Sequence, residues 1–256
     1  MPDPTKQELL AVTIMAAGKG TRMKNPEKAK VMYEISEKPM VEYVVELASK
    51  LLANRTLLIV GWQKQLVVEH FSKLSYKVEF VEQNEQLGTG HAVLQTIEPL
   101  KDFEGDVLVL SGDVPLLTEK TAKALIGYHR ATEAVATILT AELNDPTGYG
   151  RIVHNDDGSV KRIVEHKDAS KKDLTIKEIN SGIYVFNKEK LFECLPLVKP
   201  NNVQGEYYLT DVFELFWKNN WRVSAVKAID AIEVMGINDL KQLEEAQKIM
   251  EAKASL

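Results

Sequence analysis

The chain has 256 residues, of which 45% are hydrophobic and 27% charged, as is typical of a globular protein with a sizeable core. A net charge of −5 without basic stripes argues against a nucleic-acid partner, and no apolar run reaches the ~20 residues of a membrane span. Cys194 is the single cysteine, which excludes an internal disulfide, and the first ten residues lack the apolar segment of a signal peptide. We therefore expect a cytoplasmic chain with no membrane partner.

The first predicted strand, residues 11–16, ends at a basic turn that contains two glycines. Gly18 and Gly20 allow a sharp turn in which backbone N–H groups approach a ligand closely. Residues 19–30 hold five basic residues against one acid, although the whole chain is negative. This reversal of sign predicts a site for a polyanion such as a nucleoside triphosphate. The spacing matches neither the dinucleotide fingerprint nor the Walker A loop, and a plain strand-to-helix turn is the alternative.

Hydrophobic periodicity predicts alternating helices and strands in the first half of the chain. Helices are expected at 39–52, 65–74 and 88–97, and further strands at 55–61, 77–82 and 106–110. This alternation predicts an α/β fold with a Rossmann-like, mostly parallel sheet flanked by helices. Ligands of such sheets bind at the carboxyl ends of the strands, where the glycine turn, the segment after residue 82 and Asp113 all fall.

The pattern in the second half of the chain predicts an antiparallel or mixed extension of the same sheet. Short β-like segments are expected at 134–143, 151–153, 160–164 and 183–186. They are followed by a helix at 209–217, a strand at 221–229 and an amphipathic helix at 239–252. Because no linker divides the chain, we expect one domain with lobes at about 11–118 and 119–238 and a terminal helix over 239–256.

Three side chains at predicted strand ends suggest chemistry. Asp113 follows a strand and a glycine, where a rigidly held carboxylate suits Mg²⁺, although a turn or helix cap is the alternative. Gln83 carries an amide whose donor and acceptor faces match the edge of uracil and mismatch that of cytosine. Gly88 allows the backbone to approach a base or ribose. His91 lies early in a predicted helix, which favours a histidine hydrogen-bonded within the fold over a general base.

Seven short motifs occur in the order found in sugar-nucleotide pyrophosphorylases. They span 16–23, 86–92, 112–116, 145–153, 164–169, 178–183 and 204–211. Together they resemble the uridylyltransferase half of the bacterial bifunctional N-acetylglucosamine-1-phosphate uridylyltransferases, over residues 11–243. The first and third motifs are shared by the whole superfamily, whereas 148–152, Glu165 and 204–211 are specific to the hexosamine branch.

The resemblance implies the nucleotide-diphospho-sugar transferase fold and an enzyme that makes UDP-N-acetylglucosamine and pyrophosphate from UTP and N-acetylglucosamine 1-phosphate. It implies in-line attack on the α-phosphate, with Arg22 and Lys30 on the phosphates and Asp113 and Asn238 as ligands of Mg²⁺. The residues implied to hold the nucleotide are Ala16, Ala17, Gly18, Gly20, Gln83, Gly88 and Thr89. Those implied to line the sugar pocket are Gly150, Glu165, Asn180, Tyr208 and Thr210.

The sequence leaves alternatives for some of these residue roles and for the function. Lys28 competes with Lys30 as the phosphate-binding lysine, because Ala29 stands where the family has proline, and Lys30 is preferred because residues 30–32 match the family pattern. Asn238 lies in a stretch that is also typical of a helix N-cap. The family's β-helix, its acetyltransferase activity and its trimer are not carried over. The alternatives are a nucleotidyltransferase for another base or sugar and a catalytically silent nucleotide-sugar-binding module.

Overall fold

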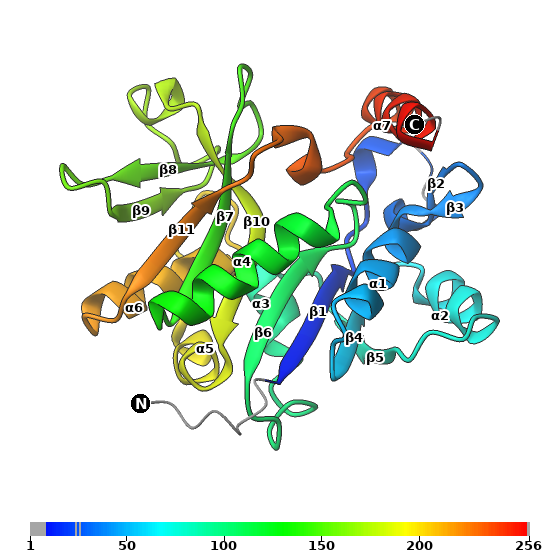
Figure 1. Ribbon diagram of the computed structural model, residues 1–256, viewed down its shortest axis with the longest axis horizontal. Coiled ribbons are helices and arrows are strands. Elements are labelled where there is room, and N and C mark those ends of the chain that lie inside the picture. Colours follow the sequence, from blue (N-terminus) through cyan, green and yellow to red (C-terminus); the bar gives the residue numbers. More distant parts are fainter. Residues whose placement is uncertain (1–8, 24, 26, 255–256) are drawn as a thin grey trace.

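A nine-stranded sheet forms the centre of the protein and crosses both predicted lobes (Figure 1). The computed structural model describes residues 9–23, 25 and 27–254, so the prediction about the N-terminal segment falls mostly outside the described residues. The main row of strands runs in the order β11 (Val223–Lys227), β7 (Ala136–Glu142), β10 (Glu178–Asn187), β6 (Asp106–Ser111), β1 (Leu10–Ala16), β4 (Arg55–Val60), β5 (Glu79–Glu82).

Strand β10 is the one strand of this row, as the structure describes it, that opposes its neighbours. It is antiparallel to both β6 and β7, whereas the other adjacent pairs of the row are parallel. Strand β8 (Gly150–His154) pairs with β10 and with β9 (Val160–Val164). The predicted mostly parallel sheet with a mixed extension is therefore confirmed. Because β10 is reversed, its first residues lie at the edge where the parallel strands end, and Asn180 stands opposite Thr140 of β7.

Helices cover both faces of the sheet because successive strand residues point to opposite sides. Helices α1 (Met40–Lys50), α2 (Lys64–Ser72) and α4 (Glu119–Thr132) share a core with Val12 and Ile14 of β1. Helices α3 (Thr89–Leu94), α5 (Lys188–Cys194) and α6 (Val212–Lys218) share the opposite core, which includes Ala11. In Figure 1, α1 and α4 lie in front of the sheet. Burial on both faces explains the continuous apolar character of β1, β4 and β6.

Several elements differ from the prediction. Helices α4 and α5 were not predicted, although each begins at a capping residue: Thr118 accepts from the Thr121 N–H and Asn187 from the Lys190 N–H. The short hairpin of β2 (Glu34–Ile35) and β3 (Lys38–Pro39) was also missed. It packs against α7 (Leu240–Ala254), which anchors the end of the described chain. Within the described ranges, no helix is both long and apolar enough to cross a membrane.

Candidate active site

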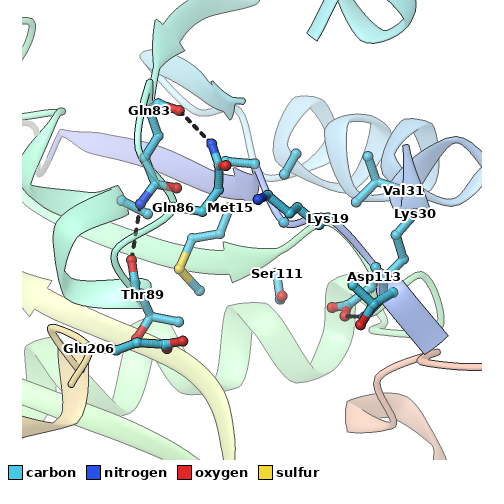
Figure 2. A pocket seen from close by; sticks show the side chains of 17 residues that line it. Met15, Lys19, Lys30, Val31, Gln83, Gln86, Thr89, Ser111, Asp113 and Glu206 are labelled. Atoms are coloured by element: carbon cyan, nitrogen blue, oxygen red, sulfur yellow. Dashed lines mark hydrogen bonds and ion pairs between the residues drawn. The ribbon is translucent and has the colours of Figure 1, made fainter. Parts of the chain in front are cut away.

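A cavity of about 460 Å³ opens where β1, β5 and β6 end, at the edge of the sheet predicted to bind ligands. Its wall is formed by residues 15–21, by Lys30, Val31, Ser111, Asp113 and Glu206, and by five residues of the segment after β5: Gln83, Gln86, Gly88, Thr89 and Ala92. Figure 2 shows Gln83, Gln86 and Thr89 at one end of the cavity and Lys30 and Asp113 at the opposite end. The volume suits a small-molecule ligand.

The two glycines of the basic turn have separate structural reasons. A Cβ on Gly18 would meet no atom within 4 Å, and Gly18 lines the cavity, so its backbone is open to a ligand. Gly20 has φ +60°, and a Cβ there would collide with the side chain of Lys30. Glycine at this position therefore lets the turn close over Lys30. Ala16 and Ala17, which are predicted to hold the nucleotide with them, line the cavity beside them.

Four residues from distant parts of the chain converge at the lysine end of the cavity. The Lys30 ammonium pairs with the Asp113 carboxylate and donates to Asn238 Oδ1 over 2.8 Å. Arg22, which is exposed and is not among the lining residues, donates to the same Asn238 oxygen over 3.2 Å. Burial would raise the pKa of the Asp113 carboxyl, but the charge and hydrogen bond of Lys30 outweigh it, and that pKa lies below its ordinary value. Asp113 therefore presents an ionised carboxylate to the cavity.

Asn238 does not cap the following helix. The Gln242 N–H donates to Asp239 Oδ1, so Asp239 caps α7, and the Asn238 N–H donates to Gln242 Oε1. The Asn238 amide nitrogen donates to the Gly236 carbonyl, which turns its oxygen toward Lys30 and Arg22. The helix N-cap expected within residues 236–239 is therefore present at Asp239, which leaves the Asn238 side chain to the site. The backbone also holds this segment to the site, since the Ile237 N–H donates to the Asp113 carbonyl.

The donor set at this end fits a magnesium ion. Asp113 and Asn238 each direct an oxygen at the Lys30 ammonium, so that ammonium marks a point on which a carboxylate and an amide oxygen converge. Mg²⁺ is a hard cation that takes one or two carboxylates together with substrate phosphates. No cluster of three or more His, Cys, Asp or Glu side chains suited to a metal occurs among the described residues. The set accordingly suits a metal shared with a phosphorylated substrate better than a cage made by protein alone.

The Gln83 amide lies at the opposite end with its donor face turned into the protein. Gln83 is 3% exposed, and its Nε2 lies 3.1 Å from both the Gly88 carbonyl oxygen and His91 Nδ1. Among the described residues no hydrogen bond engages its Oε1. The acceptor Oε1 is therefore the atom of this amide that remains for a ligand, and the reading of a base by Gln83 stays a prediction. His91 is hydrogen-bonded within the fold, as predicted, and lies outside the lining residues.

Backbone hydrogen bonds tie the glutamine end to a distant segment, residues 204–209. The Tyr207 N–H donates to Leu87 O over 2.8 Å, and the Gly90 N–H donates to Tyr207 O over 2.7 Å. Thr89 Oγ1 accepts from the Leu209 N–H over 3.0 Å. A Cβ on Gly88, where φ is +113°, would lie 2.5 Å from Tyr207 O. The close approach predicted at Gly88 is thus made to the protein's own backbone.

A second cavity of about 180 Å³ shares Met15 and Thr89 with the first and continues it. Four of the five residues assigned to the sugar pocket line it: Gly150, Glu165, Asn180 and Thr210. Thr210 donates to Glu165 Oε1 over 2.9 Å, and burial raises the pKa of the Glu165 carboxyl. The fifth residue, Tyr208, is not among the lining residues; it is buried and its hydroxyl accepts from Gln204.

Sequence reasoning assigned no role to several residues that line the two cavities. They are Met15, Val31, Ser111 and Glu206 in the first, and Tyr149, Ser181, Gly182, Tyr184 and Leu209 among those of the second. The backbone marks one of them, Gly182, as unusual. It has φ +78° and lies within an irregularity of β10 between Asn180 and Tyr184. Such irregularities re-aim side chains beside functional sites. Here the Asn180 amide donates to the Tyr184 hydroxyl over 2.7 Å.

The family model described as nucleotidyl transferase matches residues 11–232, and the chain belongs to this family. It is 49% identical over 246 residues to the bifunctional protein GlmU of Acetivibrio thermocellus, covering 96% of this chain and 52% of that protein. It is 47% identical over 237 residues to the bifunctional protein GlmU of Geobacillus thermodenitrificans, covering 93% of this chain and 51% of that protein. The resemblance inferred from the motifs is confirmed, and the chain spans about half the length of these relatives.

Two solved structures share the fold at low sequence identity. A UDP-glucose pyrophosphorylase complexed with UDP-glucose superimposes with a TM-score of 0.76 at 19% identity, covering 96% of this chain and 99% of that one. HddC from Yersinia pseudotuberculosis superimposes with a TM-score of 0.69 at 22% identity, covering 94% of this chain and 99% of that one. The predicted fold class, a mixed and mostly parallel sheet flanked by helices, is confirmed.

Proposed function

We propose that this chain is a uridylyltransferase that forms UDP-N-acetylglucosamine and pyrophosphate from UTP and N-acetylglucosamine 1-phosphate. The observation that carries the proposal is the convergence of Lys30, Asp113 and Asn238 at one end of a cavity whose other end holds the Gln83 amide. A nucleoside triphosphate is a ligand with a hydrogen-bonding base at one end and a polyanion at the other. Membership of the nucleotidyl transferase family supports the same class of reaction.

The substrates would lie along the two connected cavities. UTP would place its base near Gln83 and its phosphates along the Gly18–Gly20 turn, whose backbone N–H groups suit an anion. The sugar would enter the second cavity, where Glu165 and Asn180 offer partners for hydroxyl and acetamide groups. Because the cavities share Met15 and Thr89, the sugar phosphate and the α-phosphate would meet between them.

The reaction would be an in-line displacement at the α-phosphorus. An oxygen of the sugar phosphate forms a bond to the α-phosphorus of UTP, the bond to the bridging β-phosphate oxygen breaks, and pyrophosphate leaves. The attacking oxygen is already anionic, so catalysis needs alignment and charge neutralisation rather than a general base. Lys30 and Arg22, which both donate to Asn238, would stabilise negative charge on the transferred and leaving phosphates.

Asp113 and Asn238 are the residues proposed to hold Mg²⁺, because their oxygens converge beside the phosphate-binding turn. When bound, Mg²⁺ neutralises phosphate charge and helps to align the reacting groups. Asp113 is ionised by its pairing with Lys30, and the Asn238 oxygen is oriented by the bond from its own amide nitrogen to Gly236. Contacts within the protein thus fix the charge of the Asp113 carboxylate and the orientation of the Asn238 oxygen.

The test is a pyrophosphate-release assay over a panel of nucleotides and sugar phosphates. UTP, CTP, dTTP, GTP and ATP would each be combined with N-acetylglucosamine 1-phosphate and glucose 1-phosphate, with MgCl₂ or with EDTA. We expect release to be fastest with UTP and N-acetylglucosamine 1-phosphate and to need the metal. A different preferred pair would identify another nucleotidyltransferase. Calorimetric binding of UDP-N-acetylglucosamine without any release would identify a silent binding module.

A further inference from the structure

We propose that His91 is a positioning residue that holds the base-reading amide of Gln83 with its acceptor oxygen toward the nucleotide, so that the site takes a base carrying an N–H at that point. This inference rests on the proposed uridylyltransferase function. It assigns a specificity role to a side chain that does not line the cavity.

The Gly88 carbonyl provides the first of two constraints on which way the Gln83 amide faces. Gln83 Nε2 lies 3.1 Å from Gly88 O. Turning the amide over would bring Oε1 against that carbonyl and set two acceptors against each other. Because Gln83 is 3% exposed, water cannot readily relieve such a conflict, and an unpaired buried acceptor is costly. The backbone at Gly88 is itself braced by the bonds between Leu87, Gly90 and Tyr207.

His91 adds the second constraint, because a primary amide nitrogen carries two hydrogens. One hydrogen of Gln83 Nε2 is donated to Gly88 O, and the other points to His91 Nδ1 over 3.1 Å. Nδ1 accepts when the ring is neutral and carries its proton on Nε2. Gln95 Nε2 lies 3.2 Å from that Nε2 and donates to the His91 carbonyl over 3.0 Å. Because Gln95 is only half-buried, water can satisfy that carbonyl when the Gln95 amide turns to accept the proton. The opposite tautomer would point a hydrogen of Nδ1 at Gln83 Nε2, and turning Gln83 to accommodate it would set Oε1 against the Gly88 carbonyl.

The consequence is that the amide selects a base by its hydrogen-bond donor at N3. With both amide hydrogens engaged, Gln83 offers Oε1 alone to the cavity. Uracil presents N3–H, which donates to this oxygen. Cytosine in the same register presents the lone pair of its unprotonated N3, which repels it. The triphosphate and the shared ribose hold the register of both nucleotides, so a released amide that rotated by half a turn would accept cytosine instead.

The test compares UTP with CTP, which differ only on the base edge, in wild type and three variants. His91→Leu removes the acceptor and keeps an apolar side chain beside Tyr207, whose ring centroid is 6.2 Å from that of His91. His91→Asn restores an oxygen acceptor near the position of Nδ1. Gln95→Ala removes the neighbour of Nε2 and leaves Nδ1 in place. Pyrophosphate release gives kcat/KM for each nucleotide, with N-acetylglucosamine 1-phosphate held constant.

We expect the ratio of kcat/KM for UTP to that for CTP to fall about tenfold to a hundredfold in His91→Leu. It should recover in His91→Asn and stay at the wild-type value in Gln95→Ala. An unchanged ratio in a folded His91→Leu protein would overturn the inference, as would a loss of discrimination in Gln95→Ala equal to that in His91→Leu. If His91→Leu does not fold, His91→Ala lacks the same acceptor and replaces it. Wild-type protein that releases no pyrophosphate from UTP would instead refute the proposed function.

Discussion

At the scale of single residues, the choice between two lysines shows how position decides a role. Lys30 is 14% exposed in its side chain, lines the nucleotide cavity and pairs with Asp113. Lys28, two residues earlier, is 36% exposed, lies 3.6 Å from Glu34 and sits over the Tyr33 ring. Surface pairs of the second kind contribute little to stability. Of the two lysines, Lys30 is therefore the one that lines the cavity, and we propose it as the residue that would meet the phosphates.

Replacing each lysine by alanine gives a matched pair of variants. Lys30→Ala should lower kcat by roughly 10² or more, because it removes a cation preorganised at the phosphate end of the cavity. It should also lower the melting temperature, since it leaves the Asp113 carboxylate without its partner. Lys28→Ala should change kcat by less than about twofold. Steady-state pyrophosphate release and thermal melting would show this, and equal losses in both variants would contradict it.

Arg22 should separate catalysis from folding. It is exposed, and the structure gives it one bond to Asn238 Oδ1 among the described residues. Arg22→Ala should therefore leave the melting temperature nearly unchanged. Turnover with UTP should fall by about 10²–10³, as loss of one preorganised donor does in other enzymes. Normal turnover by the purified variant would reject the proposed role.

Asp211 should give the protein a measurable pH dependence of stability. Burial, reinforced by the charges of Glu214, Glu165 and Asp168, raises the pKa of its carboxyl to about 6. A raised pKa means that the contribution of Asp211 to stability is intact below the ordinary value near 4 and is lost as pH rises through about 6. Asp211→Asn should match wild type near pH 4 and exceed it by on the order of 1 kcal/mol at pH 7, allowing for its partial exposure. Urea unfolding at both pH values would measure the difference, and a constant difference would refute it.

At the scale of elements, the turn after β1 and the turn before α3 use glycine for opposite purposes. Gly18→Ala adds a Cβ into open space on the cavity wall. It should leave the melting temperature unchanged and raise the KM for UTP several-fold by crowding the phosphates. Gly88→Ala drives a Cβ to 2.5 Å from Tyr207 O at φ +113°.

Gly88→Ala should accordingly lower the melting temperature by several degrees, because a strained backbone position of this kind costs about 1–3 kcal/mol and each kcal/mol shifts a chain of this size by roughly 2–4 °C. It should also raise the KM for both substrates, because the hydrogen bonds between residues 87–90 and 207–209 hold residues that line both cavities. Differential scanning calorimetry and initial rates would distinguish the two variants. Equal thermal effects in both would contradict the distinction.

Most of the central strands could be predicted because each is an apolar run bounded by turn residues. β1, β4 and β6 are buried on both faces, so their valine and isoleucine content alone marks them. Helix α4 was missed because its hydrophobic positions are few and polar residues separate them, although Thr118 signals its start. The two-residue strands β2 and β3 are too short for any periodicity. Their pairing depends on Met40 and on α7, which follows some 200 residues later.

Site residues were predictable to the extent that they follow strands. Asp113 and Gln83 lie directly after β6 and β5, where a parallel sheet presents its ligands. Asn238 follows no strand, and only the resemblance to a known family pointed to it. Its placement depends on the long-range bond between the Ile237 N–H and the Asp113 carbonyl. The orientation of the Gln83 amide was likewise hidden, because it is set by the fold around Gly88 and His91.

At the scale of the whole molecule, an aromatic core supports the wall of the second cavity. Phe213 of α6 packs against Tyr184 and Phe186 of β10, with ring centroids 5.5 and 5.6 Å away. The Tyr184 hydroxyl in turn accepts from Asn180, and both residues line that cavity. The core therefore sets the position of groups proposed to meet the sugar.

Phe213→Ala should lower the free energy of unfolding by about 3–5 kcal/mol, because it opens a cavity among rings that are fully buried. At a temperature where the variant is still folded, the KM for N-acetylglucosamine 1-phosphate should rise more than the KM for UTP. Phe80→Ala, at a ring that is 38% exposed on β5, is the matched control and should cost less than about 1 kcal/mol. Urea denaturation and initial rates would reveal either pattern, and equal costs would contradict the assignment.

The hydrogen bonds between residues 87–90 and 207–209 constrain how this scaffold can be re-engineered. A loop from another protein could be grafted over residues 204–211 to change the proposed sugar preference. The graft would replace backbone atoms that form hydrogen bonds with the segment holding Gly88 and Thr89. In such a chimera the wall proposed to meet the base would be disturbed together with the sugar pocket. Transplanting both segments as one cassette is the exchange that the architecture permits.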